Sequence, residues 1–325
     1  MIQSLCIRKR SAECFLCLKI ILSVMFGILL LQSTGYAGEV PQKGFAAPED
    51  AATALVKALE NNDRMELLAI FGPDGKALVD SGDEVQDRIH RNRFVRAFKE
   101  KRLFENKKEE GVILCVGKNE WPFPLAIVKK NDQWFFDTQA GIEEILNRRI
   151  GRNELKVMEI LQAYRDAQRE YASEDRDGDG VLEYARKIAS ERGHRNGLYW
   201  EWEEGKEESP IGPLVAAATE KNYRVKDKAT KGSGTPYYGY FYKILEGQGP
   251  GAQGGACGYV AKENMILGFG MLAYPAEYGI SGIMSLIVNQ EGVIHEKDFG
   301  ENTSKIVETI KLYDPDGSWK KVPSP

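Results

Sequence analysis

Apolar residues recur at helical spacing through the segment that follows residue 40. They predict helices over 48–60, 63–71 and 84–104. In the first of these, Pro48 stands at the start and acidic residues follow it, which is typical of a helix N-terminus. The Gly72-Pro73 pair ends the second helix.

The period changes to that of strands after residue 111. Apolar runs at 112–116, 125–128 and 133–137 predict strands, and Asn131-Asp132 predicts a hairpin between the last two. Helices followed by an antiparallel sheet predict an α+β module over 38–138. A curved sheet of the nuclear-transport-factor or cystatin type is the fold analogy that this order of elements suggests.

The second half of the chain opens with helical spacing and ends in strands. We predict a helix over 141–150, an interruption at Gly151, and a new helix that Asn153 caps and that continues to Tyr171. Strand-like runs follow at 237–245, 265–273 and 283–289. Residues 139–325 are therefore predicted to form a second module, a helix packed on a second antiparallel sheet.

A short apolar run near the N-terminus has a positively charged lead. Four basic residues within 8–19 precede the largely apolar run Ile20–Leu31, and small residues flank Tyr36. This pattern predicts a secretory signal peptide over 1–37, and hence a periplasmic or secreted protein. The run is shorter than the ~20 residues that span a bilayer, so we expect no permanent membrane span after cleavage.

Cleavage after residue 37 makes the chain more acidic. The whole chain has 44 basic and 48 acidic residues. Four of the basic residues and one of the acidic residues lie in the leader. The remaining 40 basic and 47 acidic residues have a net charge of −7. Nucleic-acid binding is not expected, because it needs a concentrated basic face.

Cys115 and Cys257 are the cysteines that remain after cleavage. Exported proteins can join such a pair, which makes it a candidate disulfide. Two separate thiols fit the pattern as well, because sequence does not define the separation of the Cα atoms.

The segment after the second-half helix begins like a calcium-binding loop. Acidic residues alternate in Asp-Arg-Asp-Gly-Asp-Gly, and Gly180 at the sixth position permits the tight turn. The twelfth position holds Arg186 where a bidentate glutamate is usual. Neighbouring carboxylates repel one another without a cation, so the sequence favours a structural Ca²⁺ site over a solvated turn. The candidate ligands are the side chains of Asp175, Asp177, Asp179 and Glu183 and the carbonyl of Val181.

Two groups of aromatic residues are a candidate binding surface for a glycan or a protein of the envelope. Exposed aromatic rings stack on sugars and contribute strongly to interfaces. Packing in a sheet core is the alternative, because strands favour aromatic residues in any case. The candidate surface consists of Tyr199, Trp200, Trp202, Tyr237 and Tyr238.

Several long segments match a known family pattern. They are residues 134–138, 140–146, 148–154, 175–180, 197–200, 209–213 and 274–279. Through them the chain resembles the bacterial exported family numbered 2950 among the domains of unknown function. The resemblance implies an envelope location and brings no established activity. The C-terminal half also resembles a pilin or pseudopilin head, through Ala167, Gln168 and Tyr171 and the run 289–294.

No catalytic constellation stands out in the sequence. The three histidines lie far apart, and the glycine-rich run 247–258 lacks the Lys-Ser/Thr ending of a phosphate-binding loop. We therefore expect an exported envelope protein with a non-enzymatic structural or interaction role. Two alternatives stay open. One is an enzyme or binding protein for cell-wall polysaccharide, which as a hydrolase needs two carboxylates about 5–10 Å apart. The other is a pilus-associated minor subunit.

Overall fold

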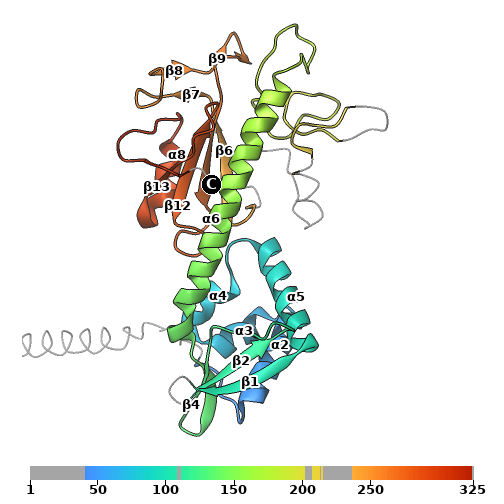
Figure 1. Ribbon diagram of the computed structural model, residues 1–325, viewed down its shortest axis with the longest axis vertical. Helices are drawn as coiled ribbons and strands as arrows, with labels where there is room; N and C mark the ends of the chain where they lie inside the picture. The colour runs from blue at the N-terminus through green and yellow to red at the C-terminus, as the bar shows by residue number, and fades with distance from the viewer. Residues whose placement is uncertain (1–40, 108–110, 202–206, 213, 215–235, 324–325) are drawn as a thin grey trace, which may run out of the picture. The chain divides into compact units, whose positions relative to one another are not determined.

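The computed structural model has the α+β architecture that the sequence predicts (Figure 1). Residues 42–325 form one compact unit. In the part of the chain that is described, no helix combines the length and apolar character needed to cross a membrane. The predicted leader over 1–37 and Trp202 lie outside the described residues. The structure describes residues 41–107, 111–201, 207–212, 214 and 236–323.

The first module consists of helices followed by an antiparallel sheet. The helices are α2 (Pro48–Glu60), α3 (Arg64–Phe71), α4 (Lys76–Val79) and α5 (Glu84–Glu100), with the 3-10 turn η1 (Pro73–Gly75). The strands are β1 (Arg102–Lys107), β2 (Gly111–Val116), β3 (Trp121–Pro122), β4 (Ile127–Lys130) and β5 (Gln133–Phe136). They pair in the order β1-β2-β4-β5, and β3 pairs with β2.

The helices of this module bury their apolar faces against the sheet. Leu55, Leu67 and Phe136 are each 1% exposed. The rings of Phe71 and Phe136 meet edge to face, with their centroids 5.7 Å apart. Full burial of a large apolar side chain stabilises a fold by about 1.5–3 kcal/mol, so these contacts hold the module together.

Two local predictions for this module have different outcomes. The hairpin is confirmed, because Asn131 and Asp132 take φ values of +49° and +60° between β4 and β5. The single helix over 84–104 is too long, because α5 ends at Glu100. Phe104 instead pairs with Leu114 across β1 and β2, so strand pairing overrides the helical spacing there.

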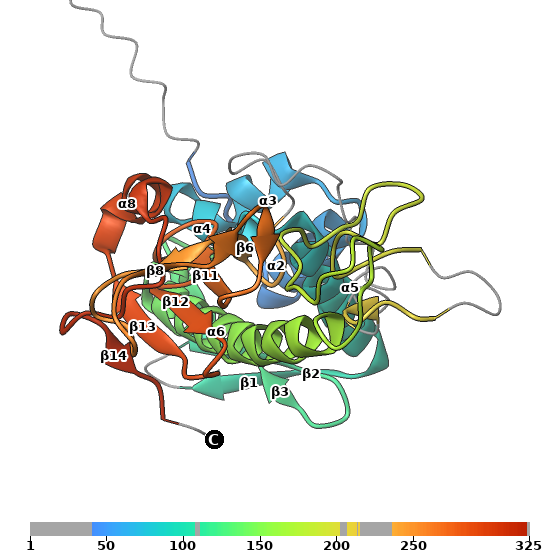
Figure 2. The ribbon, with the colours of Figure 1, turned by 90° about the horizontal axis from the view of Figure 1, so that it is seen from above.

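The second module is built on an antiparallel sheet in the order β14-β13-β12-β11-β6. Its strands are β6 (Tyr240–Leu245), β11 (Gly270–Pro275), β12 (Met284–Asn289), β13 (His295–Asp298) and β14 (Lys320–Lys321). Two short ribbons pair β7 (Gly247–Gln248) with β8 (Cys257–Gly258) and β9 (Val260–Ala261) with β10 (Asn264–Met265). The 3-10 turn η2 (Gly300–Asn302) leads into α8 (Thr303–Thr309). The long helix α6 (Thr138–Tyr171) packs on β11 and β12, as predicted for a helix on a second sheet (Figure 2).

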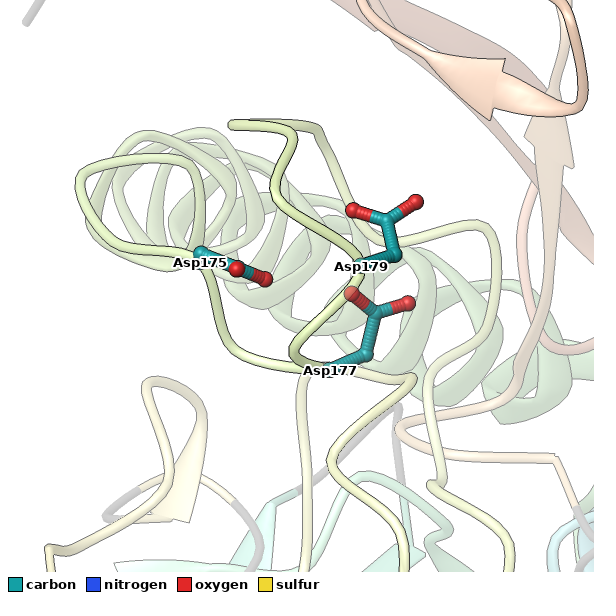
Figure 3. A group of neighbouring side chains, drawn as sticks. All are labelled: Asp175, Asp177 and Asp179. Atoms are coloured by element: carbon teal, nitrogen blue, oxygen red, sulfur yellow. The ribbon is translucent and has the colours of Figure 1, made fainter.

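The predicted interruption at Gly151 is wrong, because α6 runs through it as one helix of 34 residues. A glycine inside a helix costs only about 1 kcal/mol relative to alanine, which contacts on either side of it offset. Asn153 does not cap a helix, because it lies inside α6. Its side-chain amide instead donates to the carbonyl of Ser281 at 2.8 Å. The helix ends at Tyr171, and the acidic loop follows directly (Figure 3).

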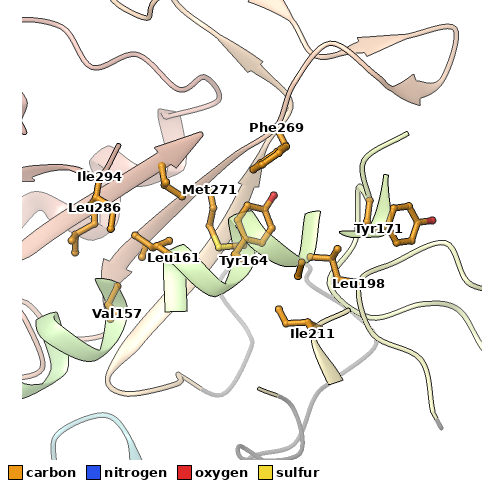
Figure 4. Packing of buried hydrophobic residues seen from close by; sticks show 14 of the residues in the cluster. Val157, Leu161, Tyr164, Tyr171, Leu198, Ile211, Phe269, Met271, Leu286 and Ile294 are labelled. Atoms are coloured by element: carbon orange, nitrogen blue, oxygen red, sulfur yellow. The ribbon is translucent and has the colours of Figure 1, made fainter. Parts of the chain in front are cut away.

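The core of the second module lies between α6 and its sheet (Figure 4). Leu161 and Phe269 are fully buried, and Tyr164 is 1% exposed. The Tyr164 and Phe269 rings meet edge to face at 5.7 Å. The Tyr164 hydroxyl donates to the Gly270 carbonyl at 3.3 Å and accepts from the Gln168 amide at 2.9 Å. This buried polar group is therefore satisfied, as the low-dielectric interior requires.

Candidate functional site

The shape of the acidic loop is defined by its own hydrogen bonds. Asp175 Oδ1 accepts from the Gly178 N–H at 2.8 Å, and its Oδ2 accepts from the Gly180 N–H at 2.9 Å. Asp179 Oδ1 accepts from the Val181 N–H at 2.8 Å. Gly178 and Gly180 take φ values of +82° and +87°, which glycine adopts without strain. The alternation of Asp and Gly therefore specifies this turn locally.

The loop brings its aspartates together on one side (Figure 3). One carboxylate oxygen each from Asp175, Asp177 and Asp179 lies within 4.8 Å of the other two, and all three residues are exposed. Ca²⁺ binds oxygen ligands at 2.3–2.6 Å, so two ligands of one ion lie at most about 5 Å apart. This set of carboxylate oxygens fits a hard cation such as Ca²⁺.

The far side of the loop is tied to the ribbon strand β10. The Asn264 amide donates to Asp179 Oδ2 at 2.5 Å, and the Met265 N–H donates to Glu183 Oε2 at 3.0 Å. Burial raises the pKa of Glu183, and the nearby Asp177 and Asp179 carboxylates raise it further. Glu183 therefore anchors the loop to β10. Glu183 and the Val181 carbonyl both stay predicted ligands beside the group of three aspartates.

The aromatic residues of the candidate surface are partly buried. Trp200 is 9% exposed, and its indole N–H donates to the Glu207 carbonyl at 3.1 Å. Tyr238 is also 9% exposed and meets Tyr237 edge to face at 4.7 Å. Tyr199 and Tyr237 are half-buried. Trp200 and Tyr238 therefore pack inside the fold, as expected if these aromatic residues belong to the core rather than to a binding surface.

The candidate disulfide is not formed in the structure. Cys115 is buried in β2, Cys257 is exposed in β8, and both are free thiols. The two strands belong to different sheets, which separates the side chains. Burial raises the pKa of Cys115, so this thiol behaves as a small apolar side chain.

A cavity of about 930 Å³ lies in the first module and extends to α6. Its apolar lining includes Leu55, Leu59, Phe71, Phe94, Phe123 and Ile145. Its basic lining consists of His90, Arg91, Arg93, Lys118, Arg148, Arg149 and Arg152, and Glu100 is the one acidic side chain among the described lining residues. The site was not predicted from the sequence. The only signal for it was the density of basic residues in 88–96 and 148–152, which is also typical of a solvated helix face.

Burial and neighbouring cations define the electrostatics of the cavity. Arg152 Nη1 lies 2.7 Å from His90 Nε2, which accepts when the imidazole is neutral. Burial, together with the smaller effects of the Arg152, Arg149 and Arg93 guanidinium groups, lowers the pKa of His90 to about 4. Arg149 donates to the carbonyl of Ala77 at 2.7 Å, which holds its guanidinium at the cavity wall. The site is therefore strongly positive while His90 is neutral at pH 7.

The low pKa of His90 predicts that acid destabilises the protein. The folded-state pKa of about 4 lies below the ordinary value of 6.5, so the unfolded chain binds more protons between these values. Stability should fall as the pH drops from 6.5 to 4, by about 1 kcal/mol between pH 7 and 5 after allowing for solvent screening. Urea unfolding of the parent and His90→Gln at both pH values measures this difference. An identical pH dependence in the two proteins would contradict the assignment.

The described residues thus define an α+β protein with an acidic loop in one module and a basic, apolar-walled cavity in the other. The chain belongs to the family described as "Protein of unknown function (DUF2950)", whose model matches residues 42–322. The family that the sequence motifs suggested is thereby confirmed, and it covers both modules. No curated protein and no solved structure matches the chain.

Proposed function

We propose that this protein is an exported, non-enzymatic envelope component whose second module is stabilised by Ca²⁺ bound at Asp175, Asp177 and Asp179. The observation that carries the proposal is the convergence of three carboxylate oxygens within 4.8 Å on a loop of fixed shape. Three negative charges this close repel one another, and a divalent cation removes that repulsion. The basic N-terminal lead and apolar run support export.

The position of the loop explains what the ion would do. The loop follows the end of α6, and Asp179 and Glu183 connect it to β10 through Asn264 and Met265. An ion held by the aspartates would therefore fix the exit from the core helix relative to this ribbon. Its role would be structural, because the loop lies on the surface and its hydrogen bonds join the end of α6 to β10.

The cavity also supports a non-enzymatic role. A glycoside hydrolase needs an acid and a second carboxylate facing each other across the bond that is cleaved. Glu100 is the one carboxylate among the described lining residues, and Lys118 lies 3.2 Å from it as an ion pair. The cavity is thus suited to binding rather than to general acid–base cleavage of a glycan.

Calcium titration of the purified, chelator-treated protein tests the proposal. We expect heat of binding in calorimetry, and a stability gain of about 1.4 kcal/mol at a free Ca²⁺ concentration tenfold above Kd. For a chain of this size, the gain raises Tm by about 2–3 °C. Mg²⁺ should bind far more weakly, because it demands a tighter octahedral shell.

Asp177→Ala is the matched variant, because it removes a ligand oxygen while no hydrogen bond of the loop depends on the Asp177 side chain among the described contacts. It should abolish the calcium response. Asp74→Ala, at an exposed aspartate of the first module, should leave the response unchanged. Neither heat nor a shift in Tm in the parent protein would overturn the calcium assignment. Recovery of the protein from the periplasm with residue 38 as its first residue tests export.

A further inference from the structure

The cavity of the first module has an apolar wall that includes neighbouring aromatic rings. The Trp121 and Phe123 rings meet edge to face with centroids 6.3 Å apart, and the tilted Phe123 and Phe94 rings have centroids 5.0 Å apart. Trp121 is 42% exposed, whereas Phe71, which also lines the cavity, is buried. The wall therefore runs from solvent into the interior. A volume of about 930 Å³ is at the upper end of the range for small-molecule sites.

The polar part of the same cavity has more cationic than acidic side chains among its described lining residues. Arg148 pairs with Glu144 at 2.6 Å, and Lys118 pairs with Glu100 at 3.2 Å. In the described part of the chain, Arg93 and Arg152 form no ion pair, and both line the cavity. Burial lowers the pKa of Arg152, and the Arg93 charge lowers it further, so the two like charges already interact.

Two features of this arrangement require a specific kind of occupant. Clustered guanidinium groups repel one another until an anion with oxygen acceptors sits among them, and such charge-assisted bonds are strong. Aromatic and aliphatic walls favour an apolar body. A free inorganic anion would leave the wall hydrated, and a neutral lipid would leave the cations uncompensated. A ligand that satisfies both parts must be amphipathic and negatively charged.

We propose that this cavity binds a single-chain amphipathic anion, with its apolar body against Phe94 and Phe123 and its carboxylate or phosphate head at Arg93 and Arg152. The proposal is independent of the calcium site, because the lining residues lie between 55 and 152 and the acidic loop begins at 175. Failure of calcium binding would leave this site unaffected, and the reverse also holds.

Calorimetric titration of the full exported protein with matched ten-carbon probes tests the proposal. The probes are decanoate, decyl phosphate and the neutral 1-decanol, each below its aggregation limit. We expect an anionic probe to bind at least about tenfold more tightly than decanol, which corresponds to one charge-assisted contact. The stronger of the two anions identifies the head group. Equal affinity for anionic and neutral probes, or no binding of either anion, would overturn the proposal.

Variants assign the binding to this cavity. The double variant Arg93→Gln/Arg152→Gln should weaken anion binding by about tenfold or more and leave decanol binding unchanged. Arg88→Gln/Arg96→Gln is the matched control, because both residues are exposed on α5 and do not line the cavity. Ala97→Phe, which adds bulk to the lining, should weaken all three probes. Equal losses in the two arginine pairs would mean unspecific attraction and contradict the assignment.

Discussion

Replacing Asp83 with alanine is expected to lower the free energy of unfolding by about 3 kcal/mol. Asp83 is 1% exposed and accepts one local and one long-range hydrogen bond. Its Oδ1 accepts from the Gln86 N–H at 3.0 Å, which caps the N-terminus of α5. Its Oδ2 accepts from the Gly239 N–H at 2.9 Å. Losing the cap costs about 1 kcal/mol, and leaving a buried N–H unsatisfied costs about 1–3 kcal/mol more.

The second bond gives Asp83 an effect beyond that of an ordinary cap. It joins the start of α5 to the segment that precedes β6, 156 positions further along the chain. Gly239 takes a φ of +74°, and an added Cβ would lie 2.7 Å from the Asn153 amide nitrogen. The chain is therefore closely packed around Gly239. In the Asp83→Ala variant, the Gly239 N–H has little room to form another hydrogen bond.

Asp63→Ala is the matched control for this experiment. Asp63 caps α3 by accepting from the Glu66 N–H at 3.0 Å, is exposed, and makes no comparable long-range bond in the described structure. Urea unfolding of both variants should show a loss of about 1 kcal/mol for Asp63→Ala and about three times that for Asp83→Ala. Equal losses would mean that the bond to Gly239 contributes nothing to stability.

Two glycines of the same helix should respond to alanine with opposite signs. At Gly141, an added Cβ would lie 2.5 Å from Leu125 Cδ2 and 2.6 Å from the Pro124 carbonyl oxygen. Leu125 is fully buried and a backbone carbonyl cannot yield easily, so Gly141→Ala should destabilise by about 2–3 kcal/mol. At Gly151 nothing lies within 4 Å of the added Cβ. Gly151→Ala should stabilise by about 0.5–1 kcal/mol, since alanine favours the helix.

Thermal and urea unfolding of the two single variants measure this contrast. Because both positions lie in α6, a general effect of helix propensity would shift both in the same direction. Stabilisation by both substitutions would show that the close approach of α6 to Leu125 can relax without loss. Destabilisation by Gly151→Ala would contradict the continuous, exposed helix at that position.

The acidic loop was predictable because it is a local structure. Its geometry depends on hydrogen bonds between residues at most five positions apart and on two glycines with positive φ. Such turns are encoded in a short stretch of sequence. The same holds for the Asn131-Asp132 hairpin. What the loop is tied to was not predictable, because Asn264 is 85 positions away from Asp179.

The cavity could not be predicted from the sequence, because its lining residues are far apart along the chain. Its lining comes from five helices and the strand connections between Val116 and Leu125. Each basic residue there has the spacing of an ordinary solvated helix face when its helix is considered alone. Only the approach of α5 to the middle of α6 places Arg93 and Arg152 at one cavity. Its apolar wall likewise combines Phe94 of α5 with Phe123 of a distant connection.

The amino-acid sequence was enough to predict the α+β class, most of the helices and main strands, the family and the acidic loop. These features follow from periodicity, turn residues and motifs, which act over a few neighbouring positions. Tertiary structure alone decided that α6 continues through Gly151, that Trp200 and Tyr238 are buried, and that an arginine-lined cavity exists. Each of these depends on contacts between distant segments. Burying one large apolar side chain contributes about 1.5–3 kcal/mol, which exceeds the roughly 1 kcal/mol that separates local conformational alternatives.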